Sequence, residues 1–429
     1  MKIELPYDGT TLELDLEGRS NIRVVGEQYP VALEDSENEL LCALKAPHHS
    51  RPLDEMLPSD GAISVLISDM TRGGAVKPVL STTLRFLEER GAGPERTDVF
   101  MATGVHRGLL RSELKLHLGE EIMSRWRVHQ HDADNNDTLI DVGTTPAGTR
   151  CRINERVAGS GLVIAIGTIS FHYFAGFGGA RKLVLPGVAG RDSILSNHKL
   201  SLSKESPDKL ADGCLPGNLE GNPVHEDMLA AAKLLEAPVF AVNVIPGRDD
   251  GISFINAGEL EFSHIEACER YRELFTIDLE RKYGAVIISA GGSPKDVDLL
   301  QAHKALRHGS TALEEGGLML SALACVGGVG SDSLDRLFEK GRNGVPVRVK
   351  KGYKLNTQTA VSIYELTGRF SIYLRSMMED TDISRFGFCL WQEEFTCPLL
   401  ECYGDDDILV IPNASGFLFR TAEEANPIS

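Results

Sequence analysis

Residues 62–89 read AISVLISDMTRGGAVKPVLSTTLRFLEE, and this stretch contains the pattern that decides the fold. Its first six residues are mostly apolar with β-branched side chains, which is typical of a strand buried on both faces. A loop with polar and glycine residues follows at 68–74, and apolar residues then recur at helical spacing over 77–89. A buried strand, a loop and a helix in this order predict one unit of a parallel α/β sheet.

The same order recurs along the chain. We expect strands at 62–67, 97–103, 162–168, 239–245, 252–257, 285–289 and 317–324, and helices over 77–89, 109–118, 299–307, 331–340 and 359–366. Parallel sheets of this kind bind ligands at the carboxyl ends of their strands. The predicted fold class is therefore α/β, with two domains that carry Rossmann-like parallel sheets and an active-site cleft between them.

The length of the chain, 429 residues, exceeds what one hydrophobic core usually holds, so we expect two domains. We place a cofactor-binding domain at 1–276 and a substrate-closing domain at 284–407. The charged stretch 277–283 between them is the predicted hinge. The apolar tail within 408–429 is a candidate to pack back onto the first domain.

Composition excludes several classes of function. The 62 acidic and 44 basic residues give a formal net charge of −18, which argues against a large nucleic-acid surface. A few lysines or arginines in a cleft can still attract a small anion. The 8 cysteines contain no CxxC pair, which argues against a zinc ribbon or a thioredoxin-like site and fits a reducing cytoplasm.

The first residues, MKIELPYDGTTLELDLEG, lack the basic and apolar segments of a signal peptide. The longest apolar runs have the length of strands and are too short to span a bilayer. We therefore expect a cytoplasmic protein without a membrane partner.

Three predicted strands end in loops with reactive side chains. These loops are SDMTR at 68–72, ATGVHR at 102–107 and SFHYFAG at 170–176, and in a doubly wound sheet they converge on one crevice. His106 and His172 suit proton transfer, because an imidazole titrates near neutral pH. Arg72 suits a carboxylate or a phosphate, which it can hold through two hydrogen bonds.

Two further candidates follow the third loop. The stretch GFGGARKLVLPG at 176–187 contains Lys182, which can act as a cation or as a nucleophile. It is not a Walker A motif, because no GK[ST] sequence is present. His198 comes shortly after a predicted helix start and is a candidate metal ligand.

The ordered set DMTR, ATGVHR, FHYFAGFGGARK and NH resembles the nickel-pincer nucleotide enzymes typified by the lactate racemase family. His172 and Lys182 are 10 residues apart and Lys182 and His198 are 16 apart, as in that family. The stretch GGSPKDVDLLQAHKAL at 291–306 resembles the family's substrate-binding segment. The resemblance covers 62–306, more than half of the chain.

The resemblance implies a role for each matching residue. Lys182 would be covalently tethered to a pyridinium bis-thiocarboxylate mononucleotide, His198 would bind its nickel ion, and His106 and His172 would be the paired acid and base residues. The remaining implied contacts are Asp69, Met70, Thr71 and Arg72 with the cofactor, Arg72 also with the substrate, and Gln301 and Lys304 with the substrate carboxylate.

The implied activity is racemisation or epimerisation of a small anionic 2-hydroxy acid. One histidine would remove the hydroxyl proton while hydride leaves C2, and hydride would return to either face of the planar 2-oxo acid. Proteins of cofactor biosynthesis are the implied partners. Leu300 and His303 depart from the family's pattern beside Gln301, and this departure concerns the choice of substrate.

Three alternatives remain open. An enzyme with the same cofactor could act on a larger substrate, such as a sugar acid or an aromatic or dicarboxylic hydroxy acid. A zinc hydrolase could use His129 and His131, although their polar surroundings favour a solvated loop. A protein that only carries the cofactor would need Lys182 and His198 alone, so His106 and His172 argue against it.

Overall fold

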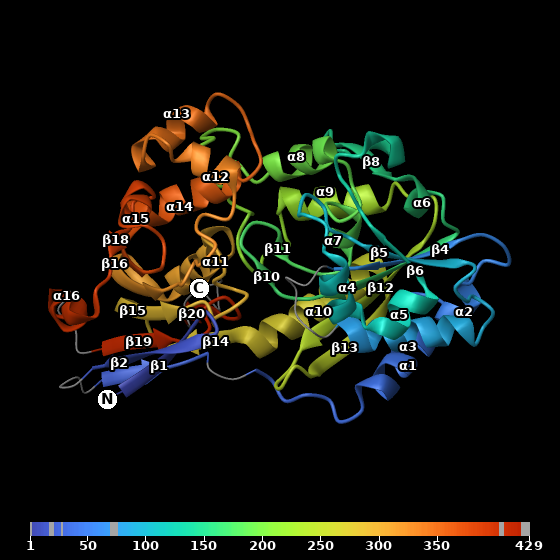
Figure 1. The fold of residues 1–429 in the computed structure, drawn as a ribbon, viewed down its shortest axis with the longest axis horizontal. Coiled ribbons are helices and arrows are strands. Elements are labelled where there is room, and N and C mark those ends of the chain that lie inside the picture. Colours follow the sequence, from blue (N-terminus) through green and yellow to red (C-terminus); the bar gives the residue numbers. More distant parts are fainter. Residues whose placement is uncertain (1, 17–20, 27–28, 69–75, 403–406, 422–429) are drawn as a thin grey trace, which may run out of the picture.

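The computed structural model describes residues 2–16, 21–26, 29–68, 76–402 and 407–421. Two six-stranded sheets lie side by side, and helices cover both (Figure 1). The mixed α/β architecture confirms the predicted fold class. Within the described part of the chain, every helix is too short or too polar to cross a bilayer.

The first sheet occupies one half of the molecule. Its strands, in spatial order, are β13 (Ile252–Glu259), β12 (Val239–Pro246), β9 (Leu162–Thr168), β4 (Ile63–Ile67), β5 (Thr97–Met101) and β6 (Arg127–Gln130). Neighbouring strands are parallel except β12 and β13. The helices of this half are α1 (Ser36–Lys45), α2 (Leu53–Met56), α3 (Val76–Glu88), α4 (Arg111–Leu118), α5 (Glu120–Arg125), α6 (Glu155–Ala158), α7 (Arg181–Val184), α8 (Arg191–Lys199), α9 (Pro223–Ala232) and α10 (Leu260–Phe275). Two hairpins complete it, β7 (Leu139–Thr144) with β8 (Arg150–Asn154) and β10 (Phe171–His172) with β11 (Gly176–Phe177).

The second sheet is parallel throughout. Its strands, in spatial order, are β18 (Cys389–Leu390), β17 (Ser371–Arg375), β16 (Leu313–Ala322), β15 (Tyr283–Ser289), β19 (Asp407–Ile411) and β3 (Asn21–Val24). Its helices are α11 (Leu299–Gly309), α12 (Asp332–Leu337), α13 (Val345–Val349), α14 (Thr357–Arg369), α15 (Asp380–Arg385) and α16 (Thr396–Cys402). The additional pairs are β1 (Lys2–Tyr7) with β2 (Thr10–Asp15) and β14 (Thr276–Leu279) with β20 (Leu418–Thr421).

The central strand β4 shows why an apolar run forms a doubly covered strand. All five of its residues are buried. Ile63, Val65 and Ile67 belong to the apolar cluster that includes α1 and α3, whereas Leu66 belongs to the cluster that includes α7 and α9. Successive side chains of a strand point to opposite faces, so this alternation buries both faces of the sheet.

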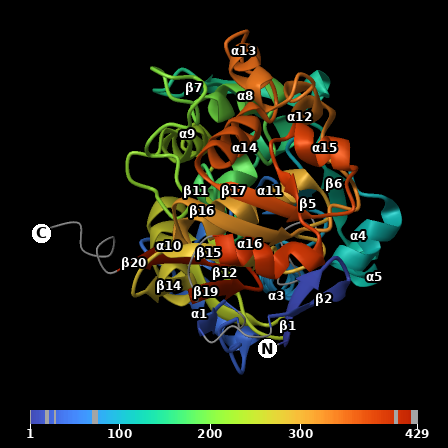
Figure 2. The same ribbon diagram turned by 90° about the vertical axis from the view of Figure 1, so that its left-hand side faces the viewer.

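The N-terminal hairpin covers one face of the second sheet. Leu5 and Leu14 pack in one cluster with Ala285 and Ile287 of β15, while helices α11 and α14 cover the opposite face. Figure 2 shows β1 and β2 beside this sheet. Residues at the start of the chain therefore belong to the C-terminal half of the molecule.

Two boundary predictions were wrong. We placed residues 1–276 together, but β3 pairs with β19 and lies in the second sheet. We considered the tail at 408–429 as packing on the first domain, but β19 is the neighbour of β15 and β20 pairs with β14. The predicted hinge at 277–283 includes residues of β14 and β15. The domain division itself stays a prediction.

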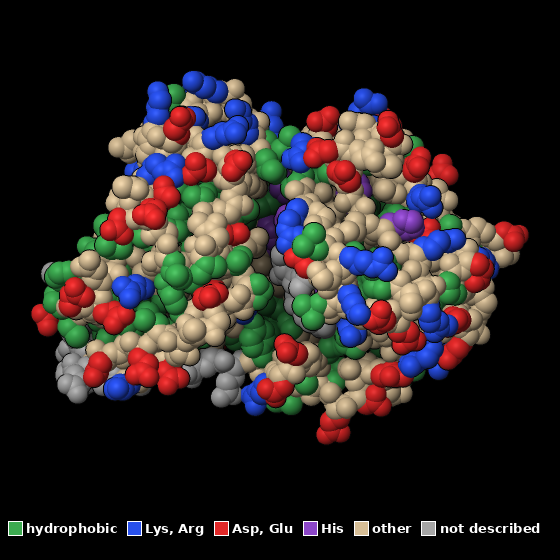
Figure 3. Space-filling view, in the orientation of Figure 1, with side chains coloured by type: hydrophobic (Ala, Val, Ile, Leu, Met, Phe, Trp, Pro, Cys, Tyr) green, Lys and Arg blue, Asp and Glu red, His purple; other side chains and the backbone are tan. Residues whose placement is uncertain are grey.

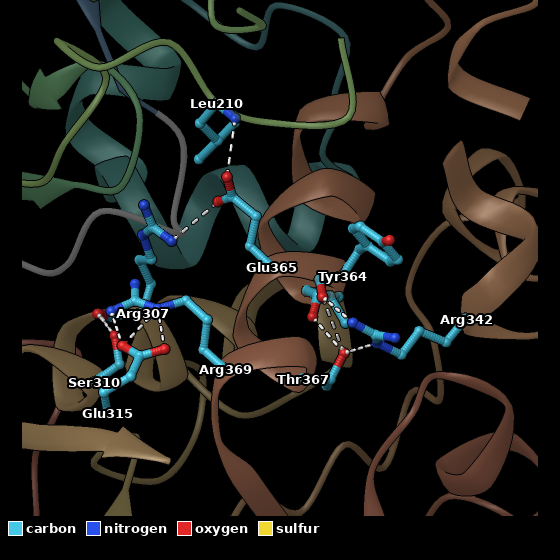
Figure 4. Close-up of polar contacts among 10 residues, drawn as sticks. Leu210, Arg307, Ser310, Glu315, Arg342, Tyr364, Glu365, Thr367 and Arg369 are labelled. Atoms are coloured by element: carbon cyan, nitrogen blue, oxygen red, sulfur yellow. Dashed lines mark hydrogen bonds and ion pairs between the residues drawn. The ribbon is translucent and has the colours of Figure 1, made fainter. Parts of the chain in front are cut away.

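Contacts across the cleft join the two halves. Glu365 of α14 accepts a hydrogen bond from the Leu210 backbone amide at 3.2 Å and one from Arg307 of α11 at 3.3 Å (Figure 4). The Tyr173 hydroxyl lies 2.7 Å from the Thr359 hydroxyl of α14. These contacts hold α11 and α14 against the loops that leave the first sheet.

Candidate functional site

The carboxyl ends of three adjacent strands form one wall of a cavity. The loops after β4 and β5 contribute Ser68 and residues 102–106 to its lining, and β9 contributes its last residue, Thr168. Helix α11 of the second sheet supplies the opposite wall. The groove between the two halves is visible in Figure 3, with histidine side chains along it. The predicted convergence of the strand ends is therefore present.

Six of the predicted site residues line this single cavity. They are His106, His172, Lys182, His198, Gln301 and Lys304. The four predicted cofactor contacts at Asp69, Met70, Thr71 and Arg72 lie outside the described residues. The roles of all ten side chains stay predictions, whereas the shared location of six of them is an observation.

His198 lies near the end of α8 and faces the cavity from a buried position. Its ring packs edge to face on Phe174, with 5.1 Å between ring centres. Burial lowers its pKa to about 3, and the positive charges of Lys182 and His106 contribute in the same direction. The ring is therefore neutral at pH 7, which is the form that binds metal ions.

Lys182 lies on α7 and also contacts Phe174. Its ammonium is 5.7 Å from the centre of the Phe174 ring. The backbone around it is tightly packed, because the Gly187 amide bonds to the Lys182 carbonyl at 2.9 Å. This segment is further connected to the loop after β5, where the Gly104 amide donates to the Gly187 carbonyl at 2.9 Å. Gly104 has a φ of +56°, a conformation that glycine adopts without strain.

The two candidate acid and base residues come from different loops. His172 is buried in the β10–β11 hairpin between the rings of Tyr173 and Phe174, and the Ala175 amide lies 3.3 Å from its Nδ1. His106 is exposed in the turn after β5, and its amide donates to the Thr103 carbonyl at 3.0 Å. One histidine is thus held rigidly, whereas the other lies at the mouth of the cavity.

Gln301 and Lys304 form a pair on the first turns of α11. The Lys304 ammonium donates to Gln301 Oε1 at 2.6 Å, which confirms that the two share a helical face. Asp298 caps this helix through a 2.8 Å bond from the Gln301 amide. Burial raises the pKa of Asp298, and the Gln301 amide and the charges of Lys304 and His106 oppose that rise.

Sequence reasoning missed the role of Arg181. This side chain is fully buried and donates to the carbonyl groups of Gly178 at 2.8 Å, Ala175 at 2.9 Å and Phe177 at 3.1 Å. Burial lowers its pKa to about 10, so it remains a cation at pH 7. Arg181 therefore fixes the loop between His172 and Lys182. Its place directly before Lys182 was the only signal in the sequence.

His303 was noted in the sequence only as a departure from the family's pattern. It is 1% exposed, lines the cavity and packs edge to face on Tyr173, with 4.6 Å between ring centres. Its Nδ1 lies 2.7 Å from the Leu300 carbonyl. Burial lowers its pKa to about 3, so a neutral imidazole lies beside Gln301 and Lys304 at pH 7.

The prediction of a solvated loop at His129 and His131 was wrong. His129 lies in β6 and stacks on Phe100 at 4.9 Å between ring centres. His131 is 4% exposed, and its Nε2 lies 2.9 Å from the Ala189 carbonyl. Among the described residues no cluster of three or more histidine, cysteine or acidic side chains could hold a metal ion. This arrangement gives the zinc hydrolase no support.

Known proteins resemble this chain over most of its length. Residues 7–209 match the model of the lactate racemase N-terminal domain. A lactate racemase from Thermoanaerobacterium thermosaccharolyticum is 30% identical over 344 residues, which are 80% of this chain and 78% of the relative. A lactate racemase from Lactiplantibacillus plantarum is 30% identical over 338 residues, which are 77% of this chain and 76% of the relative.

Solved structures are similar as well. The lactate racemase apoprotein from Thermoanaerobacterium thermosaccharolyticum has a TM-score of 0.85 and 26% identity, over 98% of this chain and 100% of that chain. A protein from Thermotoga maritima has a TM-score of 0.68 and 19% identity, over 90% of this chain and 98% of that chain, which shows a shared fold.

Proposed function

The chain belongs to the lactate racemase family of isomerases, and on that premise we propose that it inverts C2 of a small 2-hydroxy acid with a nickel-pincer nucleotide bound to Lys182 and His198. The observation that carries this proposal is the composition of one cavity. It combines a lysine, the buried neutral His198, three further histidines and an amide–ammonium pair from the opposite wall. Together these groups suit tethering, metal binding, proton transfer and carboxylate binding.

The residues present fit the proposed cofactor. His198 offers a neutral imidazole, and nickel accepts imidazole nitrogen as a ligand. Lys182 and His198 line the same cavity and both contact the Phe174 ring, so one bound group could reach both side chains. When bound there, the cofactor would supply a hydride acceptor for C2 of the substrate. Arg181 holds the loop that carries Lys182, which keeps the attachment point in place.

His106 and His172 would transfer the proton of the substrate hydroxyl. Racemisation needs an acid and base residue for each enantiomer, and these two come from separate loops on the same cavity. The aromatic rings around His172 fix its orientation, while His106 is exposed at the cavity mouth. Each histidine would accept the hydroxyl proton of one enantiomer and return a proton to the other.

Gln301 and Lys304 would bind the substrate carboxylate. The Lys304 ammonium supplies the positive charge, and the 2.6 Å bond to Gln301 Oε1 orients it toward the cavity that both residues line. A fixed carboxylate holds C2 in place between proton transfer and hydride return. Because α11 belongs to the second sheet, carboxylate binding would also draw the two halves together and exclude water.

Intact-protein mass spectrometry with nickel analysis tests the cofactor assignment. The protein is produced together with the cofactor's biosynthetic enzymes, and the Lys182→Ala variant is produced in parallel. We expect an added mass that maps to Lys182, bound nickel, and neither feature in Lys182→Ala. An unmodified wild-type mass without nickel, from a host shown to make active cofactor, would remove the proposal.

One observation favours a larger substrate as a second candidate. A second cavity, of about 540 Å³, shares Thr168, Gln301 and Lys304 with the first. It contains Lys295, whose ammonium lies 2.8 Å from the Tyr29 hydroxyl and 2.8 Å from Asn413 Oδ1. A dicarboxylic hydroxy acid held at Lys304 could extend toward this second cation. Chiral chromatography over a panel of short, aromatic, sugar and dicarboxylic acids distinguishes the two candidates.

A further inference from the structure

A series of buried polar side chains leads from His198 away from the cavity. Asn197 precedes it on α8, Asp227 lies on α9, and Thr145 and Thr149 lie in the turn of the β7–β8 hairpin. Asn197 is 0% exposed and Asp227 is 2% exposed. Buried polar groups form hydrogen bonds with few exceptions, so the directions of these bonds can be worked out from their partners.

Asp227 anchors the far end of the series. Both threonine hydroxyls donate to its carboxylate, Thr145 to Oδ1 and Thr149 to Oδ2 at 2.8 Å. A carboxylate oxygen only accepts, so each hydroxyl is the donor, and the Thr145 oxygen also accepts the Thr149 amide at 3.1 Å. The Asn197 side-chain amide is the third donor, 2.9 Å from Oδ2. The carboxylate is an acceptor for all three groups.

These partners set the orientation of the Asn197 amide. Its Nδ2 donates to the Asp227 carboxylate and also to the Val224 carbonyl at 3.2 Å. With the NH₂ group directed at two acceptors, Oδ1 faces the opposite way and lies 3.1 Å from His198 Nδ1. An amide oxygen can only accept, so the hydrogen of this bond belongs to Nδ1 of the histidine. In a neutral ring Nε2 then carries the free lone pair.

We propose that Asn197 and Asp227 are positioning residues that hold His198 in its Nδ1–H tautomer and thereby reserve Nε2 for the metal ion. The identity of the metal rests on the proposed function, whereas the tautomer does not. A histidine ligand whose second nitrogen donates to an oriented acceptor has a fixed ring plane and a more basic metal-binding nitrogen. The carboxylate behind the amide strengthens this effect, since it polarises Asn197 toward His198.

The tautomer is measured first in the apoprotein. Side-chain nitrogen chemical shifts of ¹⁵N-histidine-labelled protein at pH 7 show which ring nitrogen holds the hydrogen, and the His198→Gln spectrum assigns the signals. We expect Nδ1–H in the wild type. Asn197→Leu removes the side-chain acceptor at Nδ1, while the Ile194 backbone carbonyl, a second acceptor for the ring, remains in every variant. The tautomer population of Asn197→Leu should therefore shift from Nδ1–H toward Nε2–H. A matched control is Asp141→Asn, an exposed carboxylate on β7.

Wild-type His198 with its hydrogen on Nε2 would overturn the proposal. An unchanged His198 tautomer in the folded Asn197→Leu variant would overturn it as well. Circular dichroism shows whether each variant folds. If Asn197→Leu does not fold, the spectrum of the wild type still decides, because it must show Nδ1–H.

Nickel release from the loaded enzyme gives the second readout. With a chelator outside the dialysis membrane, we expect Asn197→Leu and Asp227→Leu to lose nickel about 10–100-fold faster than the wild type. Asp141→Asn should release it at the wild-type rate. Equal release from all of them would contradict the inference. A wild type that never takes up nickel would contradict the proposed function, while the tautomer measured in the apoprotein would still stand.

Discussion

A fall in pH from 7 to 5 should strongly destabilise the folded chain. Among the described residues six buried histidines have lowered pKa values, and burial is the largest cause in each. For four of them the pKa falls to about 3 (His198, His225 and His303) or about 4 (His308). The unfolded chain protonates these rings near their ordinary pKa of about 6.5. Below that pH the unfolded state binds more protons than the folded state, so stability falls until the folded pKa is reached.

The size of this loss of stability follows from the pKa shifts. A histidine whose pKa moves from about 6.5 to about 3 removes about 2 kcal/mol of stability between pH 7 and pH 5. None of the four side chains is more than 9% exposed, so solvent screening reduces this loss of stability only slightly. Together they remove about 8 kcal/mol, which is comparable with the whole stability of a typical domain, about 5–15 kcal/mol.

Urea unfolding followed by fluorescence at both pH values measures this loss. The His225→Leu variant tests one ring outside the proposed catalytic residues, and it should lose about 2 kcal/mol less than the wild type between pH 7 and pH 5. The control His49→Gln changes an exposed ring and should behave like the wild type. Equal stability of the wild type at both pH values would refute the reasoning, as would a His225→Leu variant with the wild-type pH dependence.

Three further predictions concern the site. Replacing His106 or His172 by glutamine should lower the racemisation rate by about 10²–10⁴-fold with nickel still bound, as chiral chromatography and metal analysis would show, and a full rate would exclude that residue. Lys295→Met should raise KM for a dicarboxylic hydroxy acid and leave KM for lactate unchanged, and equal effects on both would remove the larger-substrate candidate. Gly167→Ala should cost about 1–3 kcal/mol in urea unfolding, because a Cβ there would lie 2.3 Å from the Ala180 backbone nitrogen; the control Gly9→Ala has open space and should be neutral.

Local patterns in the sequence were enough to predict five of the six strands of the first sheet and its ligand-binding edge; β6 was not predicted. Strands β4, β5 and β9 are short apolar runs between turn signals. Parallel pairing then places their carboxyl ends together, which is why His106 and His172 line one cavity. Here local patterning and sheet geometry lead to the same answer.

Features that depend on distant partners were not predictable in this way. Strand β3 is only four residues long and pairs with β19, almost the whole chain away, and nothing within NIRV indicates that partner. Arg181 and His131 were missed because charged and polar side chains are usually exposed. Their burial depends on backbone carbonyl groups supplied by the tertiary fold.

The fate of the hydrogen at C2 of the substrate most directly tests the central claim, which is inversion through hydride transfer. A 2-hydroxy acid with deuterium at C2, lactate first, is incubated in ordinary water with the nickel-loaded enzyme, and the inverted enantiomer is isolated and its mass measured. Inversion through hydride transfer predicts that this enantiomer keeps its deuterium, because the hydrogen leaves C2 and returns to it without exchange. An inverted product that carries hydrogen from water would show deprotonation at C2 and would contradict the proposed chemistry.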